Sequence, residues 1–148
     1  MSSAPPVSPA CACGRLRRAA RALTQLYDDA MAPAGLRVTQ FSLLRTLSRA
    51  GSMRISELAA AQLLDRTALS RNLDPLVDRG LVKVAPGDDA RTRQVALTRA
   101  GKSALHAAMP YWESAQKQVA RQLGGAKLDV LIATLRDIEA LHPDVLEA

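Results

Sequence analysis

The chain has 148 residues, which is enough for one domain of ordinary size and excludes two large independent domains. Hydrophobic residues make up 48% and charged residues 23%, so we expect a buried core and exclude a disordered polar chain. Aromatic residues make up only 3%, which favours packed helices over an aromatic β-sandwich.

The net charge of +6 makes a polyanion a candidate partner. The charge is uneven, because residues 11–50 carry seven Arg and two Asp, whereas residues 100–148 carry five basic and six acidic groups. We therefore expect a positioned basic face rather than a uniformly positive surface.

Nothing in the sequence indicates a membrane or an exported protein. No apolar run approaches the roughly 18 residues of a membrane span, and Met1–Ala10 lacks the features of a secretory signal. We expect a cytoplasmic protein without membrane contact.

The N-terminal part is predicted to be a tail followed by a helix. Met1–Pro9 is rich in Pro, Ser and Ala, so residues 1–13, with Cys11 and Cys13, are assigned to a flexible tail. Apolar residues then recur at helical spacing up to the Pro-Ala-Gly of residues 33–35. They are Leu16, Ala20, Leu23, Tyr27 and Ala30.

Three shorter helices follow. We expect Thr39 to cap the second helix, Ser56 to cap a third over Glu57–Gln62, and Asp65 to cap the fourth. Glycines at 51 and 80 end the second and fourth helices. The expected buried residues are Phe41, Leu44 and Leu47 in the second helix and Leu69, Leu73, Leu76 and Val77 in the fourth.

The remainder predicts a hairpin and two long helices. Leu81–Val84 and Gln94–Leu97 alternate apolar and polar residues around a turn-rich segment, as a β-hairpin does. Thr98 is the expected cap of a long helix that kinks at Pro110, and the glycines at 124 and 125 separate it from the last helix.

This order predicts a mainly α fold with a small β-hairpin wing, a winged helix-turn-helix flanked by long dimerisation helices. A winged helix-turn-helix places its second helix in the major groove of DNA, so we expect residues 37–98 to form a DNA-binding region and residues 14–36 and 99–148 to form a helical dimerisation region. The long helices carry apolar stripes that the middle of the chain cannot cover, so a second subunit is the expected partner.

The polar face of the fourth helix is the candidate major-groove surface. Hydroxyls and a helix N-terminus suit phosphates, Arg suits guanine and Asn suits adenine. The candidates are Arg66, Thr67, Ser70, Arg71 and Asn72. The alternative is an ordinary solvated helix face.

The hairpin tip supplies a second candidate surface. Arg91 and Arg93 lie on a protruding ribbon, where an Arg fits a narrow, electronegative minor groove. The alternative is a charged turn that protects a sheet edge from aggregation.

Two segments resemble the MarR family of transcriptional regulators. Residues 65–82, DRTALSRNLDPLVDRGLV, resemble the recognition helix and first wing strand of that family. The wing pattern Asp89-x-Arg91-x-x-x-Val95-x-Leu97-Thr98, followed by Gly101, is similar to the family's wing signature. The resemblance extends over residues 14 to 141.

The resemblance implies a homodimer that binds a pseudo-palindromic double-stranded operator and acts as a repressor released by a ligand or by oxidation. It implies that Arg91 enters the minor groove with Asp89 holding it, and that Thr67, Ser70, Arg71 and Asn72 face the major groove. The role of Arg93 varies within the family.

Cys11 and Cys13 are candidate thiol sensors, because a helix start and the nearby Arg15, Arg17 and Arg18 favour thiolate chemistry. Peroxide-sensing members of the family carry a Cys near this position, but Val38 and Phe41 occupy the stretch that holds their Tyr hydroxyls. Alternatives are capture of a thiophilic metal ion completed by the partner subunit, and inert packing.

A small aromatic effector is the other candidate signal. The resemblance implies a crevice between the dimer arms and the winged helix, and the residues considered there are Tyr27, Arg45, Tyr111 and Trp112. No cofactor is expected to be required, and no metal site is firmly predicted.

Two other functions are alternatives to DNA binding. The chain lacks a zinc-protease motif, a phosphate-binding glycine loop and a nucleophile elbow, so we do not expect an enzyme. A winged helix that contacts proteins and has no operator of its own is the main alternative.

Overall fold

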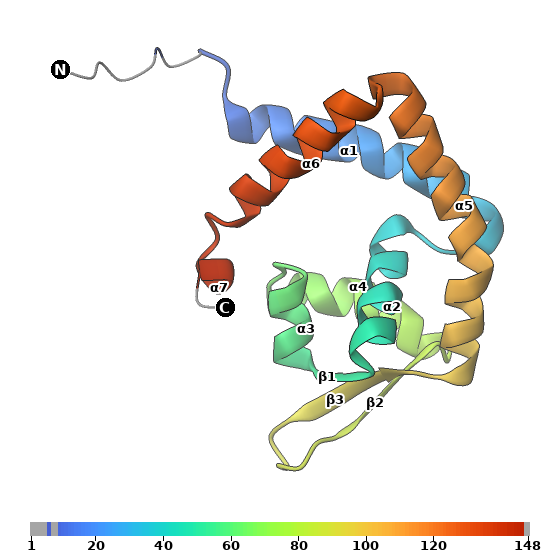
Figure 1. The fold of residues 1–148 in the computed structure, drawn as a ribbon. Coiled ribbons are helices and arrows are strands. Elements are labelled where there is room, and N and C mark those ends of the chain that lie inside the picture. Colours follow the sequence, from blue (N-terminus) through green and yellow to red (C-terminus); the bar gives the residue numbers. More distant parts are fainter. Residues whose placement is uncertain (1–5, 7–8, 147–148) are drawn as a thin grey trace.

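The computed structural model describes residue 6 and residues 9–146. Figure 1 shows a lobe, built from α2, α3, α4 and a small sheet, below an arm of α1, α5 and α6. The elements in chain order are α1 (Ala12–Met31), the short 3-10 helix η1 (Ala32–Ala34), α2 (Val38–Ala50), β1 (Ser52–Arg54), α3 (Ile55–Ala61), α4 (Arg66–Asp78), β2 (Val82–Pro86), β3 (Arg93–Leu97), α5 (Arg99–Leu123), α6 (Gly125–Glu139) and α7 (Pro143–Leu146).

The core of the lobe lies where α2 and α4 face the sheet. The predicted apolar stripes are buried in both helices, with the exception of Val77, whose side chain is 36% exposed. Leu43 was not predicted and is fully buried. The buried face of α4 is therefore narrower than the sequence predicted, because Val77 lies outside it. The buried face of α2 is wider than predicted, because it includes Leu43.

The wing is a three-stranded antiparallel sheet in the order β1-β3-β2. The hairpin was predicted, with β2 and β3 each differing by one or two residues at its ends. β1 was missed because three residues with one apolar side chain carry no periodic signal. Ser52 lies opposite Ala96 and Arg54 opposite Gln94, so β1 ties the start of α3 to the wing.

Two predicted caps are confirmed. Asp65 Oδ1 accepts a hydrogen bond from Ala68 N at 2.7 Å, and Thr98 Oγ1 accepts one from Gly101 N at 3.0 Å. Gly80 follows α4 with a φ of +71°, as its role in ending the helix requires.

Three predicted helix starts are wrong. The helix α2 begins after Arg37, not Thr39, and α3 after Arg54, not Ser56. At both sites a longer side chain three residues on, Gln40 or Glu57, accepts the hydrogen bond from the N-cap backbone amide. The helix α1 begins at Ala12, so the expected tail of residues 1–13 extends too far.

Two hydrogen bonds join the arm and the loop after α1 to the lobe, and a third lies within the arm. Asp28 Oδ1 on α1 accepts a hydrogen bond from Val38 N at 2.8 Å and so caps α2. Arg79, after α4, donates to the carbonyl oxygen of Gly35 at 2.7 Å. Within the arm, Tyr27 OH of α1 donates to Gln116 Oε1 of α5. These bonds from the C-terminal end of α1 and the loop after it add to the packing of α2 and β3 against α5 in holding the lobe.

The arm leaves apolar side chains in solvent. No residue of α6 is buried, and Val130 is 66% exposed. The helix α5 continues through Pro110, as predicted, and curves along its length (Figure 1). None of the helices within the described residues is long and apolar enough to cross a membrane.

Replacing Gly101 by Ala tests the junction between the wing and α5. A Cβ at this position would lie 1.9 Å from the carbonyl oxygen of Leu81, which is backbone and cannot move aside. We expect Gly101→Ala to lower the free energy of unfolding by about 3 kcal/mol or more, measured by urea denaturation.

The matched control is Gly125→Ala at the first residue of α6, where an added Cβ meets nothing within 4 Å. This variant should be as stable as the wild type or slightly more stable. Equal unfolding midpoints for the two variants would contradict the predicted clash.

Candidate nucleic-acid interface

The outer face of α4 carries four of the predicted contact residues. Burial of Leu69 and Leu73 fixes the rotation of the helix, and the Asp65 cap fixes where it starts. The side chains left exposed are Arg66, Thr67, Ser70 and Arg71. This face presents two guanidinium groups and two hydroxyls on the first two turns of a helix.

Asn72 is not part of that exposed face. Its side chain is half-buried and its Nδ2 donates to the carbonyl oxygen of Ala68 at 3.1 Å. With Thr39 and Ser42 it lines a hollow between α2 and the turn that leads into α4. The structure therefore directs Asn72 toward α2, whereas the sequence placed it with the major-groove residues.

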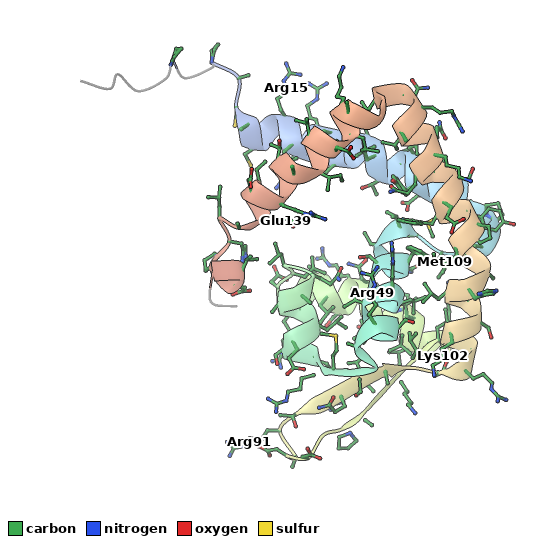
Figure 2. All side chains as sticks on the ribbon, viewed as in Figure 1. Arg15, Arg49, Arg91, Lys102, Met109 and Glu139 are labelled. Carbon is green, nitrogen blue, oxygen red and sulfur yellow. The ribbon has the colours of Figure 1, made fainter. Side chains whose placement is uncertain are left out.

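The wing tip is organised by Asp89. Its carboxylate accepts a hydrogen bond from Arg91 N at 3.1 Å, and its carbonyl oxygen accepts bonds from Thr92 N and Thr92 Oγ1. Asp89 thus holds the backbone of Arg91. Figure 2 shows Arg91 at the far end of the hairpin, away from the body of the lobe.

Four arginines from different elements line one hollow. Its volume is about 130 Å³, and it lies where the N-terminal ends of α3 and α4 meet the wing. The arginines are Arg54, Arg66, Arg91 and Arg93. Among the described residues, no carboxylate lines this hollow or forms a salt bridge with these arginines, although Glu57 and Asp89 accept hydrogen bonds from the backbone amides of Arg54 and Arg91. Such a site suits phosphate groups, which Arg binds with paired N–H donors.

Arg54 and Ser56 were not selected from the sequence, although they line the same hollow as the predicted arginines. Both line it at the N-terminal end of α3. A signal was present in the sequence, since Arg54 precedes the first helix of the predicted helix-turn-helix. Without β1, nothing indicated that this residue lies beside the wing.

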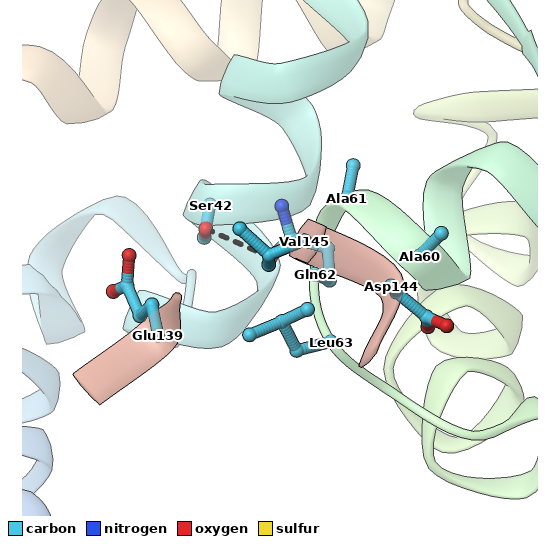
Figure 3. Close-up of a pocket in the computed structure, with 8 residues that line it drawn as sticks. All are labelled: Ser42, Ala60, Ala61, Gln62, Leu63, Glu139, Asp144 and Val145. Carbon is cyan, nitrogen blue, oxygen red and sulfur yellow. Dashed lines mark hydrogen bonds between the residues drawn. The ribbon is translucent and has the colours of Figure 1, made fainter. Parts of the chain in front are cut away.

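The turn of the helix-turn-helix is anchored to α2. Ser42 Oγ donates to Gln62 Oε1 at 3.1 Å, and Gln62 Nε2 donates to Thr46 Oγ1 at 2.9 Å. Figure 3 shows the first of these bonds beside a hollow of about 540 Å³ that Glu139, Asp144 and Val145 close from the C-terminal side. These bonds hold α3, and with it Arg54, in a fixed position relative to α2.

The two cysteines lie at the start of α1, and both are exposed. Cys11 is the N-cap residue, and its Sγ accepts a hydrogen bond from Gly14 N at 3.4 Å. Within the described residues, no group of three or more His, Cys, Asp or Glu side chains is arranged to hold a metal ion.

The four residues considered for an effector do not form one cluster. Arg45 lies over the ring of Trp112 at 4.4 Å from its centroid, and Trp112 stacks on Phe41 with 5.7 Å between centroids. Tyr27 contacts Gln116 instead, and burial raises the pKa of its hydroxyl above 10. Tyr111 is 39% exposed.

Comparisons with known proteins agree on one family. A family model described as the MarR family matches residues 34–92. A crystal structure of the M. tuberculosis transcriptional regulator MosR in complex with DNA is 42% identical, covers 90% of this chain and 99% of its own, and has a TM-score of 0.78. No curated protein matches the chain.

A more distant structure has the same fold. Mutant MarR from E. coli, complexed with operator DNA, is 24% identical over 84% of this chain and 91% of its own, with a TM-score of 0.76. The identity and coverage of the MosR match, together with the winged helix-turn-helix and the Asp89–Arg91 wing, show that this chain belongs to the MarR family of transcriptional regulators.

Proposed function

We propose that the chain is a homodimeric repressor that binds a pseudo-palindromic operator. The exposed first turns of α4 enter the major groove, and Arg91 enters the neighbouring minor groove. The observation that carries this proposal is that four arginines line one hollow where α3, α4 and the wing meet. Among the described residues, no carboxylate lines that hollow. The DNA complexes of MosR and MarR support it by similarity.

The second subunit is proposed to cover the arm. Apolar residues of α6 and of the segment after it are exposed, and Leu141 is 77% exposed. Exposure of apolar surface to water is unfavourable, so a partner that covers these side chains would lower the free energy. A two-fold dimer reads half-sites about one helical turn, roughly 10 bp, apart.

Arg91→Ala tests the wing contact. We expect operator affinity to fall about tenfold or more, since one such contact contributes roughly 1–3 kcal/mol. The measurement is a DNA-shift titration with the promoter region beside the protein's own gene.

The control is Arg121→Ala, which removes the same charge from the exposed surface of α5. Gel filtration checks that both variants remain dimers. If Arg121→Ala weakens binding as much as Arg91→Ala, net charge alone determines affinity and the wing contact is refuted. A wild type that binds no nearby promoter favours the alternative, a winged helix that contacts proteins.

Arg54→Gln tests the hollow itself. A residue that binds phosphate contributes equally to all DNA sequences and releases counterions, so the slope of log affinity against log salt should become shallower by about 0.9. Arg37→Gln is the matched control, because Arg37 is the N-cap residue of α2 and does not line the hollow. A slope that is unchanged in Arg54→Gln would remove this residue from the interface.

We propose that the signal that releases the protein from DNA acts on Cys11 and Cys13. It either oxidises one of these thiols or is a thiophilic ion that both thiols bind. Both thiols are exposed, so peroxide can convert a thiol to a sulfenic acid and arsenite can bind the pair. Oxidation of Cys11 changes the atom that caps α1, and α1 holds the lobe through Asp28. A small aromatic effector near Arg45 and Trp112 is the second candidate, supported by their stacked contact.

The double variant Cys11→Ser/Cys13→Ser tests the thiol proposal. Ser retains the cap of α1, so the variant should bind DNA as reduced wild type does. We expect peroxide or arsenite to weaken operator binding at least tenfold in the wild type and not in the variant. Equal losses in both proteins would show that the cysteines are not the sensor.

A further inference from the structure

The first half of α1 carries a cluster of arginines and no acidic residue. Between Ala12 and Tyr27 every charged side chain is an Arg, and all of these arginines are exposed. Among the described residues, no salt bridge pairs any of them with a carboxylate. Figure 2 shows Arg15 at the opposite end of the molecule from Arg91, so DNA bound at the wing lies far from this basic cluster. The basic cluster consists of Arg15, Arg17, Arg18 and Arg21.

The basic cluster is unfavourable for α1 on its own. The N-terminal end of a helix carries a partial positive charge, which repels Arg15 in the first turn. Like charges three or four residues apart on a helix also repel each other, as Arg17 and Arg21 do. Carboxylates on a neighbouring surface would remove both kinds of repulsion.

The end of α6 shows the opposite pattern. Asp137 and Glu139 lie in its last turn, where the partial negative charge of the helix end repels a carboxylate, and Asp144 follows in α7. All three side chains, which we call the acidic end, are exposed. Within the described residues, Arg136 of the same turn pairs with none of them, and the one ion pair is between Asp144 and His142 at 3.9 Å.

The two clusters do not neutralise each other within one chain. The helices α1 and α6 each pack on α5, but no salt bridge joins α1 to α6 in the described part of the chain. Figure 1 shows the start of α1 and the end of α6 projecting to the same side, away from α5. The apolar side chains of α6 that lie exposed, such as Val130 and Ile138, are on the same helix as the acidic end. A second copy that covers them would therefore also reach the acidic end.

We propose that the basic cluster of one chain lies against the acidic end of a second copy, and that this pairing of charges selects the partner. The pairing rests on the homodimer proposed above. In a two-fold dimer the contact occurs twice, because both chains use the same surface. A chain of the same fold that lacks the arginines or the carboxylates is rejected, since like charges then meet or charges stay unpaired.

The test exchanges charges between the two helices in the full-length protein. One variant, Arg15→Glu/Arg17→Glu/Arg18→Glu, makes the start of α1 acidic. The other, Asp137→Lys/Glu139→Lys, makes the end of α6 basic. Both changes agree with the helix dipole, so neither destabilises its own helix. We expect each variant alone to dimerise at least tenfold more weakly than the wild type in sedimentation velocity, because like charges face each other at both contacts.

An equal mixture of the two variants is the decisive sample. Its heterodimer has an acidic α1 against a basic α6 at one contact and the original pairing at the other. Native mass spectrometry should therefore find the heterodimer in large excess over both homodimers. The control Arg49→Glu/Lys83→Glu reverses two exposed charges of the lobe and should dimerise as the wild type does.

The outcomes separate partner selection from dimerisation itself. Variants that dimerise as tightly as the wild type, or a mixture with only the proportion of heterodimer that random pairing gives, would overturn the selection by charge. If one chain with all five substitutions dimerises while the mixture forms no heterodimer, the charges meet within a chain and the inference is wrong. A monomeric wild type would instead refute the homodimer.

Discussion

The burial of one leucine stripe determines what this molecule presents to its surroundings. Leu69, Leu73 and Leu76 of α4 are almost completely buried in the lobe, in the same core as Leu44 and Leu47 of α2. A helix has 3.6 residues per turn, so the position of these side chains fixes the direction of the others. The leucines occupy the face of α4 that packs into the core. The arginines and hydroxyls lie on other sides of the helix and are therefore exposed to solvent. A polar substitution within the leucine stripe would therefore change the orientation of α4, and with it the candidate interface, although the substituted residue is not part of that interface.

The remaining contacts place other cations beside that face. The strand β1 pairs with β3 and brings Arg54 to the wing, while Asp89 shapes the tip from which Arg91 projects. Gln62 holds the helix-turn-helix against α2. The candidate interface therefore combines groups from three separate stretches of chain, at Arg54, at the start of α4 and at the wing tip. Each is positioned by a contact within the lobe, which is strand pairing for Arg54 and a carboxylate that accepts a backbone hydrogen bond for α4 and for the wing tip.

The sequence predicted the fold well where a periodic pattern or a cap residue was present. The α4 stripe, the Asp65 and Thr98 caps and the hairpin follow from local chemistry. It failed where the signal was tertiary. Arg54 is such a case, because it joins the wing through a strand of three residues. Asn72 is a different case: its residue type suggested a base contact, but it lies three residues after Leu69 and four before Leu76, so helical spacing already places it beside the buried stripe. Tyr27 and Trp112 were assigned to one crevice because the family resemblance implies an effector site there, yet they contact different partners.

The close approach of Gly101 to the carbonyl of Leu81 has a mechanical meaning. The helix α5 starts directly on the backbone that begins β2, and there is no room for a side chain between them. The root of the wing and the start of α5 therefore pack backbone against backbone. In a dimer, a small change in the angle between the two α5 helices would move the wing tips apart or together. The wing tips would move farther than the helices themselves. Spacing along DNA would then be set at the far end of the molecule, by how the two arms cross.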